Sequence, residues 1–235
     1  MAFMLVVLSV ALFFGHYLIF KDSHHIFIYM LGDIAFLPIE IVFVSLIFHK
    51  IIEDKEKKKT HRKLNMLIGV FYSDTGNALL KMLTDSDINI TNMKNKLLIK
   101  SSWTKKNFKT AGRSIDQYKA DLELLNLKAL KTFLSKKRDF MLKIIENPSL
   151  LEHELFSELM MSLFHLQEEL SNRHDVGALV KNDSDHLKND VSRVYSMLLK
   201  DWLLYTQHLK NEYPYLFSFA IRTNPFDENA KVEIS

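Results

Sequence analysis

The sequence predicts an all-α protein, with an N-terminal transmembrane helical hairpin followed by a cytoplasmic antiparallel helical bundle. Two long apolar runs near the N-terminus predict the hairpin. Apolar residues at helical spacing through the rest of the chain predict the bundle, and no segment alternates with the period of two that is typical of strands. A length of 235 residues fits one or two small domains.

The composition excludes several classes of protein. The chain has no Cys, which excludes a disulfide framework, a thiol nucleophile and a zinc site built on thiolates. Its 6 Gly form neither a GxxxxGK[ST] nor a GxGxxG pattern, so no phosphate loop of these kinds is present. No Ser/His/Asp arrangement stands out from the background of 10 His. We therefore expect no cofactor and favour a non-catalytic protein.

Residues 2–20 form the first predicted span, because they contain no Asp, Glu, Lys or Arg. A span needs about 20 apolar residues to cross about 30 Å of hydrocarbon, and this run has that length. A secretory signal peptide is the alternative interpretation. It fits less well, because the opening MAFM has no basic residue and no A-x-A-like cleavage site follows.

Residues 26–49 form the second predicted span, and the five residues 21–25 between the runs predict a tight turn. A helix–turn–helix leaves no backbone polar group facing lipid. Many basic residues follow the second run closely, whereas the turn has one Lys. The positive-inside rule then predicts an integral plasma-membrane protein with both termini in the cytoplasm.

Asp33 and Glu40 interrupt the second span, seven residues apart and therefore on one helix face. A charged carboxylate in the middle of a bilayer costs about 2.5–3.5 kcal/mol or more. These groups form either a polar seam that holds spans together, with His16 as an available partner, or a path for cations or protons. Two spans cannot enclose a pore, so conduction requires a homo-oligomer, which we predict. Pro38 lies between the carboxylates and predicts a kink.

Residues 50–113 are predicted to be a basic helical segment next to the membrane, with fifteen Lys and Arg against six Asp and Glu. No acidic residue lies between Asp87 and Asp116. This gap predicts contact with anionic lipid headgroups of the inner leaflet, whereas a solvated face and a nucleic-acid patch are the alternatives. With a hairpin on the same chain, we expect lipid and no nucleic acid. The predicted contacts are Lys94, Lys96, Lys100, Trp103, Lys105, Lys106, Phe108, Lys109 and Arg113.

Residues 64–83 are apolar but interrupted by polar side chains, so they predict a buried or interfacial helix and not a third span. The cytoplasmic bundle is predicted over residues 114–226. Its first helix begins at the capping-box sequence Ser114-Ile-Asp-Gln and ends before Pro148.

The second helix of the bundle begins at another capping box, Ser149-Leu-Leu-Glu, and ends near Arg173. The third helix covers about 183–212, where Pro214 ends it. The apolar tail that follows is too costly to leave in water, so we expect it to dock either on the bundle or on the inner membrane surface. Residues 227–235 are expected to be frayed.

Histidines and carboxylates on the second and third helices raise the question of a metal site, because di-iron sites in bundles use such ligands. The candidates are Glu158, His165, Glu169, His186 and His208. On a helical wheel the leucines Leu151, Leu155, Leu159, Leu163, Leu166 and Leu170 point about 130° away from the Glu/His stripe. We therefore expect these side chains to be solvated or at an interface, and we predict no metal.

Two stretches, LGDIAFLPIEI in the second run and HLKNEYPYLFSFAIRTNPF near the C-terminus, together resemble a family of uncharacterised prokaryotic membrane proteins. The resemblance covers most of the chain and implies a hairpin followed by helices, without a known activity, substrate or catalytic residue. The predicted function is a membrane-anchored assembly, scaffold or sensor protein without catalysis. The alternatives are an oligomeric ion- or proton-conducting protein and a helical-bundle metalloenzyme.

Overall fold

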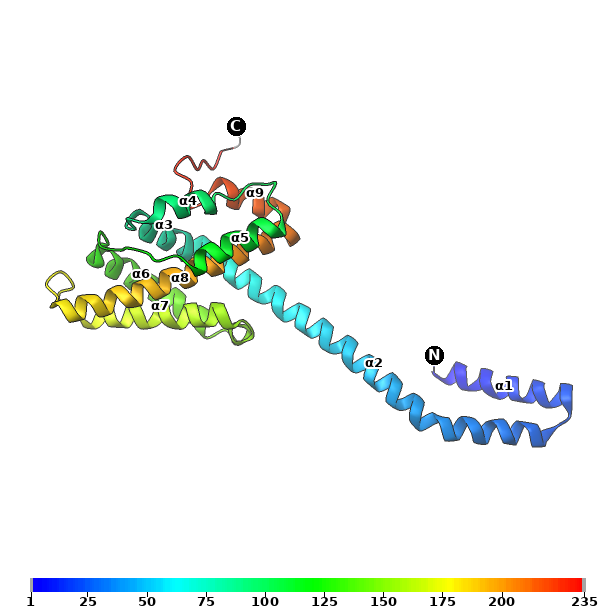
Figure 1. The fold of residues 1–235 in the computed structure, drawn as a ribbon. Helices are drawn as coiled ribbons and strands as arrows, with labels where there is room; N and C mark the ends of the chain where they lie inside the picture. Colours follow the sequence, from blue (N-terminus) through cyan, green and yellow to red (C-terminus); the bar gives the residue numbers. More distant parts are fainter. Residues whose placement is uncertain (1, 234–235) are drawn as a thin grey trace. The chain divides into compact units, whose positions relative to one another are not determined.

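The computed structural model describes residues 2–233, and every regular element in that range is a helix (Figure 1). The all-α prediction is therefore confirmed for the described residues. The chain divides into two compact units, Met1–Lys58 and Lys59–Ser235. Each unit is described by itself below.

The first unit contains α1 (Ala2–Phe20) and the beginning of α2 (Ser23–Phe71). Only Lys21 and Asp22 separate the two helices, so the turn is shorter than the five residues expected. Lys21 adopts a left-handed backbone with φ of 50°, which reverses the chain. The Asp22 carboxylate then accepts the backbone N–H of His25 at 3.1 Å, which caps the start of α2.

Helix α2 is one continuous helix of 49 residues and does not end after the second apolar run. The helix therefore continues past position 49, the expected end of the second span, because the charged residues that follow are helical as well. Lys57 and Glu53 pair at 2.6 Å with i,i+4 spacing in this part. Pro38 lies inside the helix, and the blue, N-terminal part of α2 bends (Figure 1).

The second unit contains the end of α2 and seven further α-helices, with a π-helical turn and a 3₁₀ turn between them. Their bounds are Tyr72–Gly76 (π turn), α3 Asn77–Asp85, α4 Ile90–Leu97, α5 Lys105–Asp116, α6 Leu127–Ile145, Pro148–Glu152 (3₁₀ turn), α7 Glu154–Asn172, α8 Lys181–Glu212 and α9 Pro214–Arg222.

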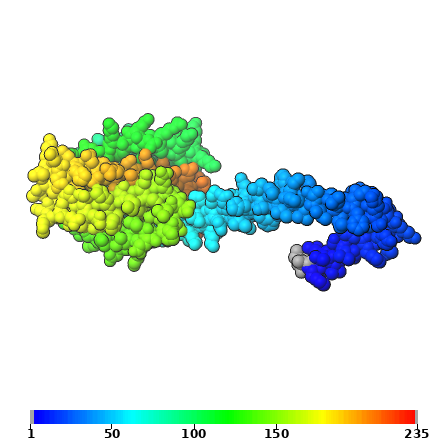
Figure 2. Space-filling model, turned by 90° about the horizontal axis from the view of Figure 1, so that it is seen from below, coloured from blue at the N-terminus to red at the C-terminus, as the bar shows by residue number. Residues whose placement is uncertain are grey.

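Helix α8 is the centre of this unit, because α3, α5, α7 and α9 all pack against it. Helix α6 packs on α7, and α4 packs on α5. The space-filling view shows the green, yellow and orange segments in close contact with one another (Figure 2). At 32 residues, α8 is about 48 Å long and can carry a row of buried side chains along the whole unit.

The predicted helix over residues 114–147 is wrong at its start. Helix α5 contains Ser114 and ends at Asp116, and α6 begins only at Leu127. The Ser114 hydroxyl donates to the Thr110 carbonyl and caps nothing. Instead, the Asn126 side chain accepts the Ala129 N–H at 3.0 Å, which makes Asn126 the N-cap of α6.

The second predicted capping box is also displaced. Its residues form the 3₁₀ turn, and His153 caps α7 by accepting the Phe156 N–H at its Nδ1, 3.2 Å away. Leu151 therefore lies outside α7 and is 84% exposed, although it was expected in the core. The third helix of the bundle is confirmed as α8.

The apolar segment over residues 64–83 is confirmed as buried, but a π-helical turn interrupts it. Phe71 and Tyr72, at the junction, are 0% and 2% exposed. Gly76 closes the turn against both rings. A Cβ at this position would lie 2.6 Å from Tyr72 Cδ1 and 2.8 Å from Phe71 Cε1, so only Gly fits there without movement.

The apolar tail packs on the bundle as α9 and the residues after it. Phe217 and Phe226 are buried, and the Phe226 ring meets the Trp202 ring edge-on at 4.9 Å between centroids. The Asn224 amide donates to the Leu97 carbonyl at 2.9 Å. Residues 228–233, within the end expected to be frayed, are exposed and not helical, whereas 234–235 lie outside the described residues.

Candidate functional site

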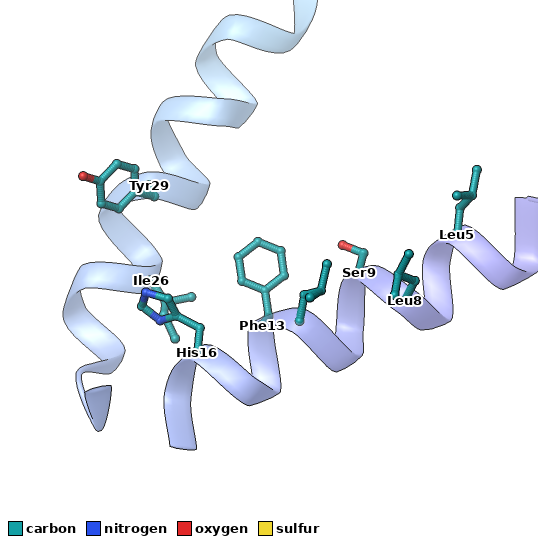
Figure 3. Close-up of a pocket in the computed structure, with 8 residues that line it drawn as sticks. Leu5, Leu8, Ser9, Phe13, His16, Ile26 and Tyr29 are labelled. Atoms are coloured by element: carbon teal, nitrogen blue, oxygen red, sulfur yellow. The ribbon is translucent and has the colours of Figure 1, made fainter. Parts of the chain in front are cut away.

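A cavity of about 480 Å³ lies between α1 and the start of α2, inside the first unit (Figure 3). His16 lies next to Ile26, while the Tyr29 hydroxyl points away from the cavity (Figure 3). Apolar side chains form most of the lining. The lining residues are Leu5, Leu8, Ser9, Leu12, Phe13, His16, Ile26 and Tyr29.

His16 contacts aromatic rings and not the two carboxylates. Its ring is 4.8 Å from the Phe20 ring and stacks parallel to the His25 ring at 6.3 Å. Its Nδ1 is buried and has no hydrogen-bond partner within residues 2–233. The structure therefore does not bring His16 together with Asp33 or Glu40 in one chain.

Asp33 and Glu40 are both exposed on α2. In the part of the chain that the structure describes, neither carboxylate forms an ion pair or a side-chain hydrogen bond. Their spacing of seven residues puts them on one face of the helix.

The predicted lipid-contact residues separate into buried and exposed groups. Phe108 is 3% exposed and belongs to the core, so the expectation that it inserts among headgroups is wrong. It was misassigned because the amphipathic helix α5 turns it inward against α8. Trp103 is half-buried, with its ring 5.0 Å from the Phe108 ring. Lys94 pairs with Glu228 at 2.9 Å.

Three of the remaining lysines line one groove of about 820 Å³. Lys96 comes from the end of α4, Lys100 from the loop that follows, and Lys106 from the first turn of α5. Lys105, Lys109 and Arg113 are exposed on α5 but do not line this basic groove. The other lining residues are Asn95, Leu98, Ser102, Trp103, Asn107, Thr110, Ala111 and Ser114.

The sequence candidates for a metal site are brought together only in part. His165 and His186 face the nearly buried Asp190 carboxylate, with Nε2 to Oδ2 distances of 3.7 Å and 3.4 Å. Glu169 lies 3.9 Å from His186. Glu158 contributes to none of these pairs, and His208 lies elsewhere, with its ring 5.7 Å from the Tyr213 ring.

Arginines neutralise this cluster between α7 and α8. Arg173 donates to both Asp183 and Glu169 at 2.6 Å, and it holds the pKa of both carboxyls below the ordinary value. Arg193 lies 3.3 Å from Asp190. Within residues 2–233, no group of three or more His, Cys, Asp or Glu side chains is arranged to hold a metal ion. The cluster is an ion-pair network that ties α7 to α8.

Sequence reasoning did not identify the pair Asp201 and Tyr72. Asp201 is 1% exposed in the core, and Tyr72 donates its hydroxyl proton to Asp201 Oδ2 at 3.0 Å. Burial raises the pKa of Asp201 to about 7, and the bond from Tyr72 opposes that rise. The only sequence signal was an Asp next to Trp202 in a helix whose neighbours are apolar.

The fold and these features define a helical protein of two units, in which the first presents apolar side chains all round. Comparison with known proteins then shows which family the chain matches. Residues 60–222 match the family described as "Uncharacterized protein MJ1433, C-terminal helical domain". Residues 1–52 match the family described as "MJ1433, N-terminal helical domain".

The chain belongs to this MJ1433 family of helical proteins. It is 42% identical over 231 residues to the "Uncharacterized protein MJ1433" of Methanocaldococcus jannaschii, and the match covers 97% of this chain and 93% of that protein. No solved structure matches the chain. The expected family of uncharacterised proteins is thereby confirmed, whereas the family descriptions state neither a membrane location nor an activity.

Proposed function

We propose that this protein is a membrane-anchored, non-catalytic assembly or sensor protein. In this proposal α1 and the apolar part of α2 form a transmembrane hairpin, and the helical second unit lies in the cytoplasm. Assembly of several copies in the membrane is the central part of the function.

The observation that carries the proposal is the surface of the hairpin. Both helices are long and apolar enough to cross a membrane. No residue from Phe3 to Lys59 is buried, so the described residues leave most apolar side chains of this segment uncovered. Exposing so much apolar area to water would be costly, because each Å² costs about 25 cal/mol. A lipid bilayer removes that cost.

The orientation rests on charge. The exposed basic residues that follow the apolar part of α2 favour the cytoplasmic side, whereas the Lys21–Asp22 turn has one basic residue. Basic side chains near an anionic leaflet add about 1 kcal/mol each to membrane attachment. Anionic lipids of the inner leaflet are accordingly the proposed lipid partners.

The unpartnered carboxylates support assembly. Asp33 and Glu40 lie in the apolar part of α2, and no group of the described chain satisfies them. A proton shared with the same carboxyl of another copy would satisfy each of them inside the membrane. The same arrangement repeated in a ring would line a path for protons or cations, which is the alternative function.

Replacing Glu40 by Gln tests the assembly. We expect light scattering of the full-length protein in a mild detergent to show a defined oligomer for the wild type and a smaller species for Glu40→Gln. The reason is that a neutral amide cannot share a proton with a second carboxyl. Asp54→Asn is the matched control, because Asp54 lies exposed on the same helix beyond the apolar run, and it should leave the mass unchanged.

A monomeric wild type would contradict both assembly and conduction. If Glu40→Gln keeps its oligomeric mass but loses proton flux in reconstituted vesicles, the conducting alternative replaces the assembly proposal. Asp33→Asn, examined in the same two assays, shows whether both carboxylates act together.

A further inference from the structure

The basic groove between α4 and α5 is lined by cationic side chains that have no ion-pair partner in the described residues. Lys96, Lys100 and Lys106 line it from three separate segments. All three are exposed, and in the described residues none of them is in an ion pair. Three unpaired ammonium groups around one concavity raise the local concentration of anions.

The loop between α4 and α5 brings further donors to the groove. Lys210, from α8, donates to the Ser101 carbonyl and so ties this loop to α8. Ser102, Asn107 and Thr110 add hydroxyl and amide groups to the lining. The groove therefore combines charge with hydrogen-bond donors, as sites for phosphate oxygens do.

The first turn of α5 carries positive charges that a bound anion would offset. The first turn of α5 contains no acidic residue and carries Lys105 and Lys106. Cations at a helix N-terminus oppose the helix dipole, whereas an anion there is stabilised by it. Asn107 accepts the Thr104 N–H at 2.8 Å and the Thr104 hydroxyl at 2.7 Å, so the end of the helix is well ordered.

We propose that this groove binds the phosphate group of an organic phosphate, either a phospholipid headgroup or a soluble phosphate ester. The volume of about 820 Å³ is far larger than a phosphate ion and lies in the range of about 300–1,000 Å³ of ligand sites. The half-buried Trp103 and Leu98 supply an apolar wall for the organic part of the ligand.

Nucleic acid fits the groove less well. Binding of single strands uses aromatic rings that are free to stack on successive bases. Here Phe108 is buried in the core and Trp103 packs edge-on against it, so no such ladder of exposed rings is present on α5. One groove with one apolar wall fits a single phosphate group and its organic substituent.

The test uses the full-length protein in a nonionic detergent and two probes. Isothermal titration calorimetry with glycerol 3-phosphate measures binding of a soluble phosphate ester. Mixed micelles with and without phosphatidylglycerol measure binding of the same group on a lipid. The groove variant is Lys100→Gln with Lys106→Gln, and we expect it to weaken binding at least about tenfold.

The matched control removes two exposed lysines from α6, as Lys136→Gln with Lys143→Gln. It should change affinity less than about twofold. All the substituted lysines are exposed, so circular dichroism should show the same helix content for every variant. Binding of the soluble ester assigns the groove to a free ligand, and binding of phosphatidylglycerol alone assigns it to a headgroup.

Three results would overturn the proposal: no binding of either probe, equal losses in the groove and control variants, or groove-dependent binding of single-stranded RNA with none of the phosphate esters. The arm with the soluble ester does not depend on the hairpin. Its outcome therefore separates failure of this inference from failure of the proposed membrane function.

Discussion

Replacing Asp201 by Asn is expected to stabilise the protein above neutral pH. Asp201 is 1% exposed, and its pKa is raised from 3.8 to about 7 because burial penalises the charged carboxylate. At pH 8 the wild type must keep a charge in its core. At 1.36 kcal/mol per pKa unit, the carboxylate costs up to about 4 kcal/mol there. We expect Asp201→Asn to be about 2–4 kcal/mol more stable to unfolding than the wild type at pH 8. The gain is smaller than the full cost of the buried charge, because burying the amide also has a cost.

The sign of the pH dependence follows from proton binding. The folded state holds the Asp201 proton more tightly than the unfolded chain, because its pKa is the higher one. The stability linked to Asp201 is therefore fully present below about pH 4 and is lost as the pH rises from about 4 to about 7. Asp201→Asn removes this decline, so the two stability curves should converge at low pH.

Urea unfolding of the full-length protein, followed by Trp fluorescence from pH 4.5 to 8.5, checks this result. Trp202 is 3% exposed and adjacent to Asp201, so it reports on this part of the core. Tyr72→Phe is the control. Loss of its hydrogen bond should move the decline to higher pH, because that bond lowers the pKa of Asp201. A difference between wild type and Asp201→Asn that is equal at pH 5 and pH 8 would refute the buried titration.

Replacing Gly76 by Ala is expected to destabilise the second unit by roughly 1–3 kcal/mol. The added Cβ would lie 2.6 Å from Tyr72 Cδ1 and 2.8 Å from Phe71 Cε1. Both rings are packed in the core and cannot move without disturbing their neighbours, since Phe71 meets Phe156 edge-on at 5.4 Å and Tyr72 stacks on Tyr205 at 5.2 Å. Displacing Tyr72 would also weaken its bond to Asp201.

Gly112→Ala is the matched control for this substitution. Gly112 also lies in a helix, but the nearest atom to its added Cβ is Leu203 Cδ2 at 3.8 Å, an ordinary contact. There Ala should stabilise the protein by about 0.5–1 kcal/mol, because Ala has the better helix propensity. The urea midpoints of both variants, compared with that of the wild type, measure these two effects. A Gly76→Ala protein as stable as the wild type would show that the π-helical turn tolerates a side chain.

The sequence alone was sufficient to predict the helical class, the apolar hairpin and α8. Each of these depends on a pattern that persists over many residues: a run without charges for α1, and a regular apolar stripe ended by Pro214 for α8. The residues at which helices begin were harder to predict. Ser114 lies in a capping-box pattern but belongs to the last turn of α5, where the neighbouring Ile115 is buried in the core.

Side-chain environments were decided by the tertiary structure. Lys96, Lys100 and Lys106 were recognised as basic, but only the packing of α4 on α5 gathers them around one groove while it turns Phe108 inward. Asp201 gains its partner only in the folded chain, where the π-helical turn brings the Tyr72 hydroxyl to it across 129 positions of sequence. Local patterns determine which residues can form a helix and which face is apolar. The charge state and the partners of a side chain depend on which distant helix covers it, and that follows only from the packed core.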